Sequence, residues 1–418
     1  MTQKRIRTTI PAAQALVGGA LTAVSFTEGG SPLAALVGLA LLYAILSHST
    51  PRQNTLRALL FCAAFHSLAT YWVAVAAYRF SESVGLSIFL TSIAWGFGIL
   101  VTVAMLRLFH YGALLSSKHG THHSQANAIT RALLFAACWT VAEWLRSWLL
   151  GGFPSVFIGV SQLESPLAHW APLLGVYGVT FTTVMIAALL STVIQQGLQR
   201  RTLAVAPLTV IVSLLAASIL LSQVRWTTPT GRLIDAVVVQ PNLSASEKWD
   251  TQKFAQHIAH TKALTEPYWF ADVIVWPETA IPAFTHNVKP LLTELDQKAT
   301  LRSAALLVGI ATQEPTHLSN VVMGLGTAKG EVSKTHLVPF AEELPWYKEW
   351  KDVYTSLGFD KPRYQAGTDQ AATITANGLQ FAVAVCFDIA YPPLSGHSTS
   401  PDLLIEASNN AWFDDTPG

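Results

Sequence analysis

The sequence predicts a multi-pass α-helical membrane domain followed by an α/β domain, and two observations lead to this fold class. Only 12% of the 418 residues are charged, whereas a soluble domain usually carries about 25%. Nearly all the long apolar runs lie in residues 1–222, while residues 223–418 have the composition of an ordinary globular domain. We therefore expect a transmembrane helical domain over 1–222 and a more polar domain over 223–418.

Seven apolar stretches in the first domain are candidates for membrane-spanning helices. A spanning helix needs about 20 apolar residues, so the second stretch is short and could be re-entrant. The first stretch is not interpreted as a cleavable signal peptide, because further spans follow it. The candidates are residues 10–26, 32–47, 56–78, 84–109, 128–150, 170–194 and 202–222.

Lysine and arginine residues indicate which side of the membrane each short loop faces. On one side the predicted loops carry Arg79 and nothing in 151–169, whereas the other side carries Lys4, Arg5, Arg7, Arg52, Arg57, Arg107, Lys118, Arg131, Arg200 and Arg201. The positive-inside rule therefore places the N-terminus in the cytoplasm. Seven crossings then place the second domain outside the cytoplasm.

Two charged residues lie near the outer end of the fifth predicted span. Glu143 and Arg146 are one helical turn apart and can form an ion pair. Two interpretations are open. The pair can extend to the membrane interface beside Trp144 and Trp148, or it can contact a lipid headgroup.

The sequence favours neither a metal site nor a nucleic-acid partner. Cys62 and Cys138 lie in apolar runs and are typical of small core residues. His119, His122 and His123 form a loop cluster without a nearby Cys, Asp or Glu, so we expect no metal there. The net charge is only +1, which gives no strongly basic field for nucleic acid.

In the second domain, short apolar runs alternate with turns and one longer helical stretch. This alternation favours an α/β arrangement, and strands that are apolar on both faces are usually covered on both sides. The predicted helix covers 249–270. The predicted strands are residues 233–239, 272–276, 304–311, 335–340 (a strand or a strand end), 381–385 and 403–406.

Three reactive groups stand at or just after the ends of predicted strands. They are Glu278, Lys334 and Cys386, and strand ends of an α/β sheet are where sites are assembled. A thiol needs a base to become a nucleophile, so a carboxylate beside it is useful. A lysine ammonium lowers a thiol pKa and stabilises an oxyanion. The sequence alone does not show that the three groups meet.

Four segments in order carry a family resemblance. Val-Ile-Val-Trp-Pro-Glu-Thr-Ala-Ile-Pro (273–282), Lys-Thr-His-Leu-Val-Pro-Phe-Ala-Glu-Glu-Leu-Pro (334–345), Val-Cys-Phe-Asp (385–388) and Ser-Asn-Asn-Ala-Trp-Phe (408–413) resemble successive motifs of the nitrilase superfamily. With the preceding spans, the chain resembles the membrane branch of that superfamily, the apolipoprotein N-acyltransferases. Glu-Trp-Leu-Arg followed by Gly-Phe-Pro is also similar to the membrane domain of that family.

The resemblance implies an α-β-β-α sandwich that moves an acyl chain from a phospholipid to the N-terminal amine of a diacylglyceryl-modified apolipoprotein. It implies no cofactor, a monomer, and a place in the bacterial cytoplasmic (inner) membrane. Carried over residue by residue, the catalytic base is Glu278, the oxyanion lysine is Lys334 and the nucleophile is Cys386. The auxiliary carboxylates are Glu342 and Asp388, and the substrate-binding residues are Trp249, Phe387, Trp412 and Phe413, with Glu143 and Arg146 in the membrane domain.

The chain departs from the family pattern in three places and also stops early. Phe387 and Asp388 stand where the family usually has Tyr and Glu, and Ala341 stands where it usually has Gly. Ending at Gly418, the chain is expected to lack the last part of the sandwich and an eighth span. A clipped chain, a gene fragment and a degenerate member are all open. We expect such a form to be poorly active or unstable.

Two other functions share the same residues. A membrane-tethered nitrilase-like amidase or hydrolase would use the same Cys, Glu and Lys with water in place of the amine. A non-catalytic membrane protein with an incomplete sandwich is the other alternative. Only the membrane domain favours a lipid as the acyl donor.

Overall fold

The computed structural model describes residues 2–47, 49–118, 125–200, 203–229, 231–315, 317–356, 364–368, 373–391, 401–413 and 416. The chain divides into two compact units. One is Met1–Thr228 with Asp415–Gly418, and the other is Pro229–Asp414. The first is helical and the second is built on two β-sheets, so the predicted fold class is confirmed.

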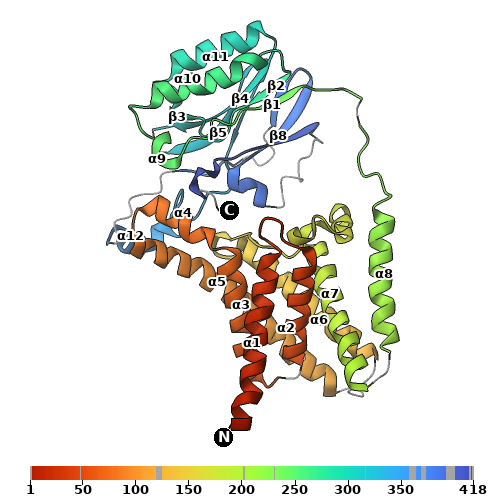
Figure 1. Cartoon of the computed structure of the whole chain (residues 1–418). Helices are drawn as coiled ribbons and strands as arrows, with labels where there is room; N and C mark the ends of the chain where they lie inside the picture. Colours follow the sequence, from red (N-terminus) through yellow and green to blue (C-terminus); the bar gives the residue numbers. More distant parts are fainter. Residues whose placement is uncertain are drawn as a thin grey trace. The chain divides into compact units, whose positions relative to one another are not determined.

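Eight α-helices in the described residues form the helical unit (Figure 1). They are α1 (Thr2–Val24), α2 (Pro32–Ser47), α3 (Pro51–Ala69), α4 (Trp72–Ser81), α5 (Val84–Lys118), α6 (Gln125–Trp148), α7 (Ala171–Arg200) and α8 (Val205–Leu221). Short 3-10 helices cover Leu149–Gly151, Val160–Gln162 and Pro166–Trp170 between α6 and α7.

By length and composition, three helical segments in the described residues can cross a membrane. They are Val84–Leu114, Asn127–Gly151 and Pro166–Leu198. Helices α3 and α4 qualify together as a fourth, although they are bent by 58°. The apolar helices Ile10–Val24, Pro32–Ser47 and Val205–Leu221 are shorter, so a total of seven crossings stays a prediction. The apolar helices indicate a membrane protein.

The span predicted over 56–78 is two helices and not one. Helix α3 ends at Ala69, and its C-cap residue Thr70 bonds back to the carbonyl of His66 through both its backbone N–H and its hydroxyl. Trp95 of α5 donates a further bond to the Thr70 hydroxyl, at 3.1 Å. These contacts fix the break, which a continuous apolar run does not reveal.

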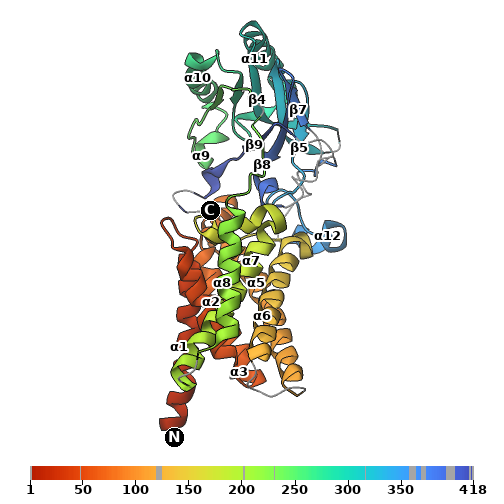
Figure 2. The same ribbon diagram turned by 90° about the vertical axis from the view of Figure 1, so that its right-hand side faces the viewer.

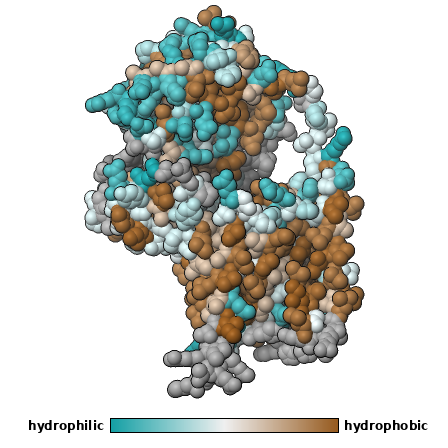
Figure 3. Space-filling model, viewed as in Figure 1, coloured by the Kyte–Doolittle hydropathy of each residue, from teal (hydrophilic) through white to brown (hydrophobic). Residues whose placement is uncertain are grey.

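Aromatic side chains and close helix contacts hold the helical unit together. Phe61 and Phe65 of α3 pack against Trp139 of α6, with ring centroids 6.1 and 6.3 Å apart. Gly19 of α1 needs its missing side chain, because a Cβ there would lie 2.3 Å from the carbonyl oxygen of Phe61. On the visible face, apolar side chains dominate the surface of this unit (Figure 3), as expected of a surface that faces lipid.

Sheet A of the second unit has six strands. They are β1 (Ala236–Val238), β2 (Val273–Val275), β3 (Ile281–Phe284), β4 (Ala305–Gln313), β5 (Leu318–Gly326) and β6 (Glu331–Ser333). The order is β1-β2-β4-β5-β6, with β3 also paired to β4. Strands β1, β2, β3 and β4 are parallel, whereas β5 is antiparallel to both β4 and β6. The start of β5 therefore lies at the edge where β4 and β6 end.

Sheet B has three strands, β7 (Thr373–Ala376), β8 (Leu379–Val385) and β9 (Leu403–Ala407), in the order β7-β8-β9. The four helices described here are α9 (Ala245–Lys248), α10 (Phe254–Thr265), α11 (Lys289–Leu301) and α12 (Tyr347–Ser356). Figure 2 shows this unit from a second side, with α10 and α11 close to sheet A.

Alternating side chains of sheet A build two cores. Leu306 and Val308 of β4 pack in one core with Leu295 of α11. Leu307, between them, packs in the other core with Phe381 of sheet B. Because successive strand residues point to opposite faces, helices cover one face of sheet A and sheet B covers the other. The unit is therefore layered as helices, sheet A and sheet B.

Two predicted elements of this unit need correction. The helix predicted over 249–270 is α10, which begins at Phe254, followed by a 3-10 turn at Glu266–Tyr268. The strand predicted over 335–340 is wrong, since β6 ends at Ser333 and no strand follows in that segment. The other alternative, that this segment follows the end of a strand, agrees with the structure.

Candidate active site

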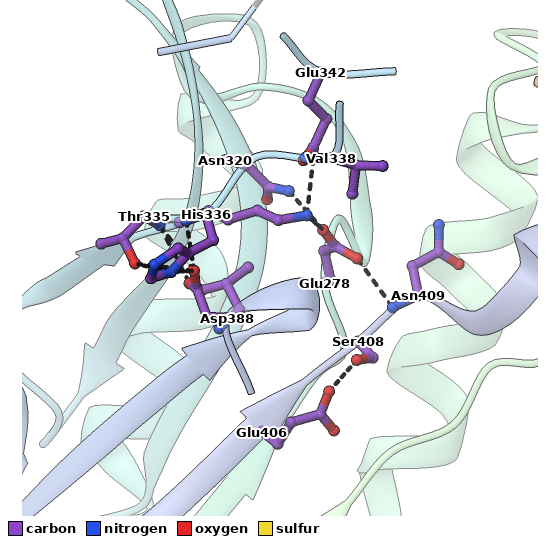
Figure 4. Close-up of polar contacts among 12 residues, drawn as sticks. Glu278, Asn320, Thr335, His336, Val338, Glu342, Asp388, Glu406, Ser408 and Asn409 are labelled. Atoms are coloured by element: carbon purple, nitrogen blue, oxygen red, sulfur yellow. Dashed lines mark hydrogen bonds and ion pairs between the residues drawn. The ribbon is translucent and has the colours of Figure 1, made fainter. Parts of the chain in front are cut away.

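The carboxylate of Glu278 is the meeting point of four segments of the sandwich (Figure 4). Glu278 follows β2 and is only 5% exposed. Its Oε1 accepts hydrogen bonds from Asn320 Nδ2 at 2.6 Å and Lys334 Nζ at 3.2 Å. Its Oε2 accepts one from the backbone N–H of Asn409, after β9, at 3.0 Å. The predicted base is therefore buried and held on both oxygens.

The ammonium of Lys334 lies between two carboxylates. Lys334 follows β6 and is 1% exposed, and its Nζ lies 3.2 Å from Glu278 and 2.9 Å from Oε1 of Glu342. Burial alone would lower the pKa of Lys334, but the negative charges of Glu278 and Glu342 raise it above its usual value. Lys334 is therefore a fixed positive charge in the site.

Glu342 is the second carboxylate on Lys334, and it also orders its own loop. Its Oε2 accepts the backbone N–H of Val338 at 2.8 Å. Burial raises the pKa of Glu342, while Lys334 lowers it. Phe340 lies between Val338 and Glu342 in the chain. Its φ of +67° is strained for a bulky residue. The loop is held in this shape by its polar contacts.

Cys386 is the first residue after β8, at the start of a 3-10 helix (Cys386–Ala390). Its φ is +52°, an uncommon value for a residue with a side chain. Burial raises the pKa of the Cys386 thiol to about 12, and the negative charge of nearby Glu278 adds to the rise while Lys334 opposes it. The thiol therefore carries its proton at rest, and Glu278 is a nearby carboxylate that can remove it.

Asp388 joins the segment that carries Lys334 to the segment that carries Cys386. Its carboxylate accepts the backbone N–H groups of Thr335 and His336, at 3.1 and 2.7 Å, and also that of Val385 at 3.3 Å. Burial alone would raise the pKa of Asp388, but hydrogen bonds from His336 and Thr335 bring it below its usual value. Because a side chain takes these N–H groups, residues 335–340 do not form a strand.

The four aromatic residues predicted to bind substrate occupy different places. Trp249 follows α9 and is 45% exposed. Phe387 is half-buried next to Cys386, and its ring meets that of Tyr391 edge-on at 5.2 Å. Trp412 and Phe413 are half-buried at the end of a 3-10 helix after β9. Their arrangement around one acyl chain stays a prediction.

Three residues near Glu278 were missed by the sequence reasoning. Asn320 sits in β5 and is 3% exposed. Lys248 is 4% exposed and donates from Nζ to the backbone carbonyl of Glu278 at 3.0 Å, and burial lowers its pKa to about 8. A Cβ on Gly309 of β4 would lie 2.2 Å from the carbonyl oxygen of Pro277. Of the three, only Asn320 could have been noticed in the sequence, because it is a polar residue within an otherwise apolar segment.

Glu143 and Arg146 are not placed as predicted. Both are 1% exposed, inside the helical unit. Glu143 accepts hydrogen bonds from Trp139, the backbone of Ile158 and Thr180, whereas Arg146 donates to the carbonyl of Ser155 at 3.3 Å. In the described part of the chain no ion pair joins the two, and both side chains are buried. A role for them in binding a lipid headgroup stays a prediction. His119, His122 and His123 lie outside the described residues.

Comparison with known proteins agrees with this architecture. Residues 18–189 match the family described as apolipoprotein N-acyltransferase N-terminal domain. Residues 236–417 match the carbon-nitrogen hydrolase family. The two matches define a membrane protein that carries a carbon-nitrogen hydrolase domain.

Individual relatives narrow the class of protein further. The apolipoprotein N-acyltransferase of Pseudomonas syringae pv. tomato is 30% identical over 405 residues, which cover 96% of this chain and 78% of the relative. That of Methylococcus capsulatus is 31% identical over 411 residues, again 96% and 78%. That of Azotobacter vinelandii is 30% identical over 414 residues. The chain belongs to the apolipoprotein N-acyltransferase family, as the motifs predicted.

Proposed function

We propose that this protein transfers an acyl chain from a phospholipid to the N-terminal amine of a diacylglyceryl-modified apolipoprotein. The observation that carries the proposal is the buried Lys334 ammonium, which lies between Glu278 and Glu342, with charges that both Glu278 and Lys334 exert on the Cys386 thiol. A base, a cation and a protonated nucleophile are the groups that acyl transfer through a thioester requires. The relatives named above are apolipoprotein N-acyltransferases.

In the first half-reaction, Glu278 removes the thiol proton and the Cys386 sulfur attacks the ester carbonyl of the phospholipid. Lys334 and backbone N–H groups stabilise the oxyanion that forms. The carbon–oxygen bond to glycerol then breaks, and Glu278 returns its proton to the departing lysophospholipid. An acyl-thioester on Cys386 remains.

In the second half-reaction, the lipoprotein amine attacks the thioester carbonyl and gives its proton to Glu278. The carbon–sulfur bond breaks, an amide forms, and the Cys386 thiolate recovers its proton from Glu278. No cofactor takes part. We propose a transmembrane domain over 1–222 in the cytoplasmic membrane and a catalytic domain over 223–418 on its outer face, with Trp249, Phe387, Trp412 and Phe413 near the acyl chain.

The test is transfer of a labelled acyl chain in two stages. Purified protein is incubated with a phospholipid labelled in its acyl chain, and a synthetic diacylglyceryl-cysteine peptide is then added. We expect the label on the peptide amine with wild type and none with Cys386→Ser. Release of free fatty acid without labelled peptide would instead show a hydrolase, and no release of either product would show a non-catalytic protein.

A further inference from the structure

A groove with two arginines opens on the surface of the helical unit, far in sequence from the acyl-transfer residues. It has a volume of about 360 Å³ and is lined by Pro51, Arg52, Thr55, Leu56 and Leu59 of α3 and by Arg107 of α5. We call it the basic groove. Two neighbouring helices each contribute one arginine to the lining of this groove, so two positive charges belong to the same surface feature.

No carboxylate in the described residues balances these charges. Arg107 donates to the neutral hydroxyl of Tyr111 at 3.3 Å, and neither Arg52 nor Arg107 has an acidic group within the 4.0 Å of an ion pair. Residues 1–228 contain four acidic residues. Glu28 follows α1, Glu82 follows α4, Glu143 lies in the last third of α6, and Glu164 precedes α7. All four lie toward the other end of the helices.

Two other arginines, Arg57 and Arg131, have a structural role that Arg52 and Arg107 do not share. Arg57 donates to the carbonyl of Ile45 at 2.5 Å, and Arg131 donates to that of Ser47 at 3.2 Å. Both therefore satisfy the last carbonyl groups of α2, where a positive charge stabilises a helix. Arg52 and Arg107 cap no such carbonyl in the described contacts, so their charges stay available to an anion.

The rest of the groove suits a lipid and not a small soluble ion. Leu56 is 55% exposed and stands with Leu59 beside the arginines, which gives an apolar wall next to the charge. Helix α3 begins at Pro51, capped by Thr50 and Gln53, so the positive end of its dipole also lies at the groove. A phosphate with an attached acyl chain matches both features.

We propose that the basic groove binds the headgroup of an anionic phospholipid, such as phosphatidylglycerol, in the leaflet that the predicted cytoplasmic loops face. Arg52 and Arg107 bind the phosphate, and an acyl chain lies along Leu56 and Leu59. Basic pockets between membrane helices on this side are suited to anionic headgroups. The proposal does not depend on acyl transfer, because the groove shares no residue with the catalytic site.

The test measures thermal stabilisation by lipid. Protein stripped of lipid in a neutral detergent is titrated with phosphatidylglycerol, phosphatidylethanolamine or inorganic phosphate, and the unfolding temperature is recorded. We expect a saturable rise with phosphatidylglycerol alone, since a ligand that binds only the folded state stabilises it. In Arg52→Gln/Arg107→Gln the half-saturating concentration should rise about 25-fold, which is about fivefold per lost charge.

Arg225→Gln is the matched control, because Arg225 is exposed outside the groove and the charge change is the same per residue. This control should keep the wild-type titration. An equal response of the double variant and wild type, or an equal response to phosphatidylethanolamine, would overturn the proposal. Full stabilisation by inorganic phosphate would also overturn it. Native mass spectrometry of wild type, which should retain phosphatidylglycerol, tests binding without any variant.

Discussion

At the scale of single residues, the site is defined by a buried cation that two carboxylates hold. Lys334 is 1% exposed and bonds both Glu278 and Glu342. Removing one member of a buried charge cluster leaves the others uncompensated. Lys334 therefore orders the site as well as stabilising the oxyanion, and its loss affects both stability and chemistry.

Asn320 positions the base, and its removal should slow thioester formation. In Asn320→Leu the Glu278 carboxylate loses a 2.6 Å hydrogen bond. A hydrogen bond to a charged group contributes about 1.5–3 kcal/mol, so we expect the rate of Cys386 acylation to fall roughly 10- to 100-fold. Single-turnover kinetics with a labelled phospholipid measure this rate. An unchanged rate at an unchanged unfolding temperature would show that Asn320 is only structural.

Lys248 should make stability depend on alkaline pH. Its pKa is lowered from 10.5 to about 8 by burial. Between these two values the unfolded chain holds a proton that the folded chain has lost, so stability rises with pH across this window. Below pH 8 both states are protonated and the burial of the charge costs on the order of 3 kcal/mol.

The matching experiment compares wild type with Lys248→Met from pH 7 to pH 10.5. We expect wild type to gain in unfolding temperature relative to the variant as the pH rises above 8. Lys289→Met, which removes an exposed lysine at the start of α11, is the control and should show no such trend. A constant difference between wild type and Lys248→Met across this range would contradict the assignment.

At the scale of elements, Asp388 fixes the loop after β6 against the loop after β8. In Asp388→Ala three backbone N–H groups lose their acceptor. We expect a loss of about 3 kcal/mol, which lowers the unfolding temperature by roughly 6–12 °C. Asp388→Glu keeps a carboxylate and should retain most of the stability. Calorimetry measures both, and equal unfolding temperatures for Asp388→Ala and wild type would refute this role.

Strands were predictable where apolar residues follow one another without interruption. The apolar runs that became β1, β2, β4, β8 and β9 were found within a few residues. The strands β3, β5, β6 and β7 were missed; Pro282 interrupts β3, and polar Ser319 and Asn320 interrupt β5. The segment 335–340 looked like a strand, but its N–H groups are taken by Asp388 and Glu342.

At the scale of the whole molecule, the chemistry depends on long-range folding that no spacing reveals. Glu278 and Lys334 follow the ends of two strands of sheet A, and Cys386 follows a strand of sheet B. They were identified because the motifs that contain them occur in the same order as the motifs of the family. The direction of a side chain inside the helical unit was not predictable, so Glu143 and Arg146 were expected as an ion pair at the interface or as a headgroup contact, and both side chains are buried.

The most direct test of the central claim is the mass of the peptide that contains Cys386 after incubation with phospholipid alone. With no amine acceptor present, the first half-reaction should leave one acyl chain on that peptide, and hydroxylamine should release it because thioesters are labile to this reagent. Glu278→Gln should lower the yield and Cys386→Ser should abolish it. An acyl chain absent from this peptide, or found equally in Cys386→Ser, would contradict the account.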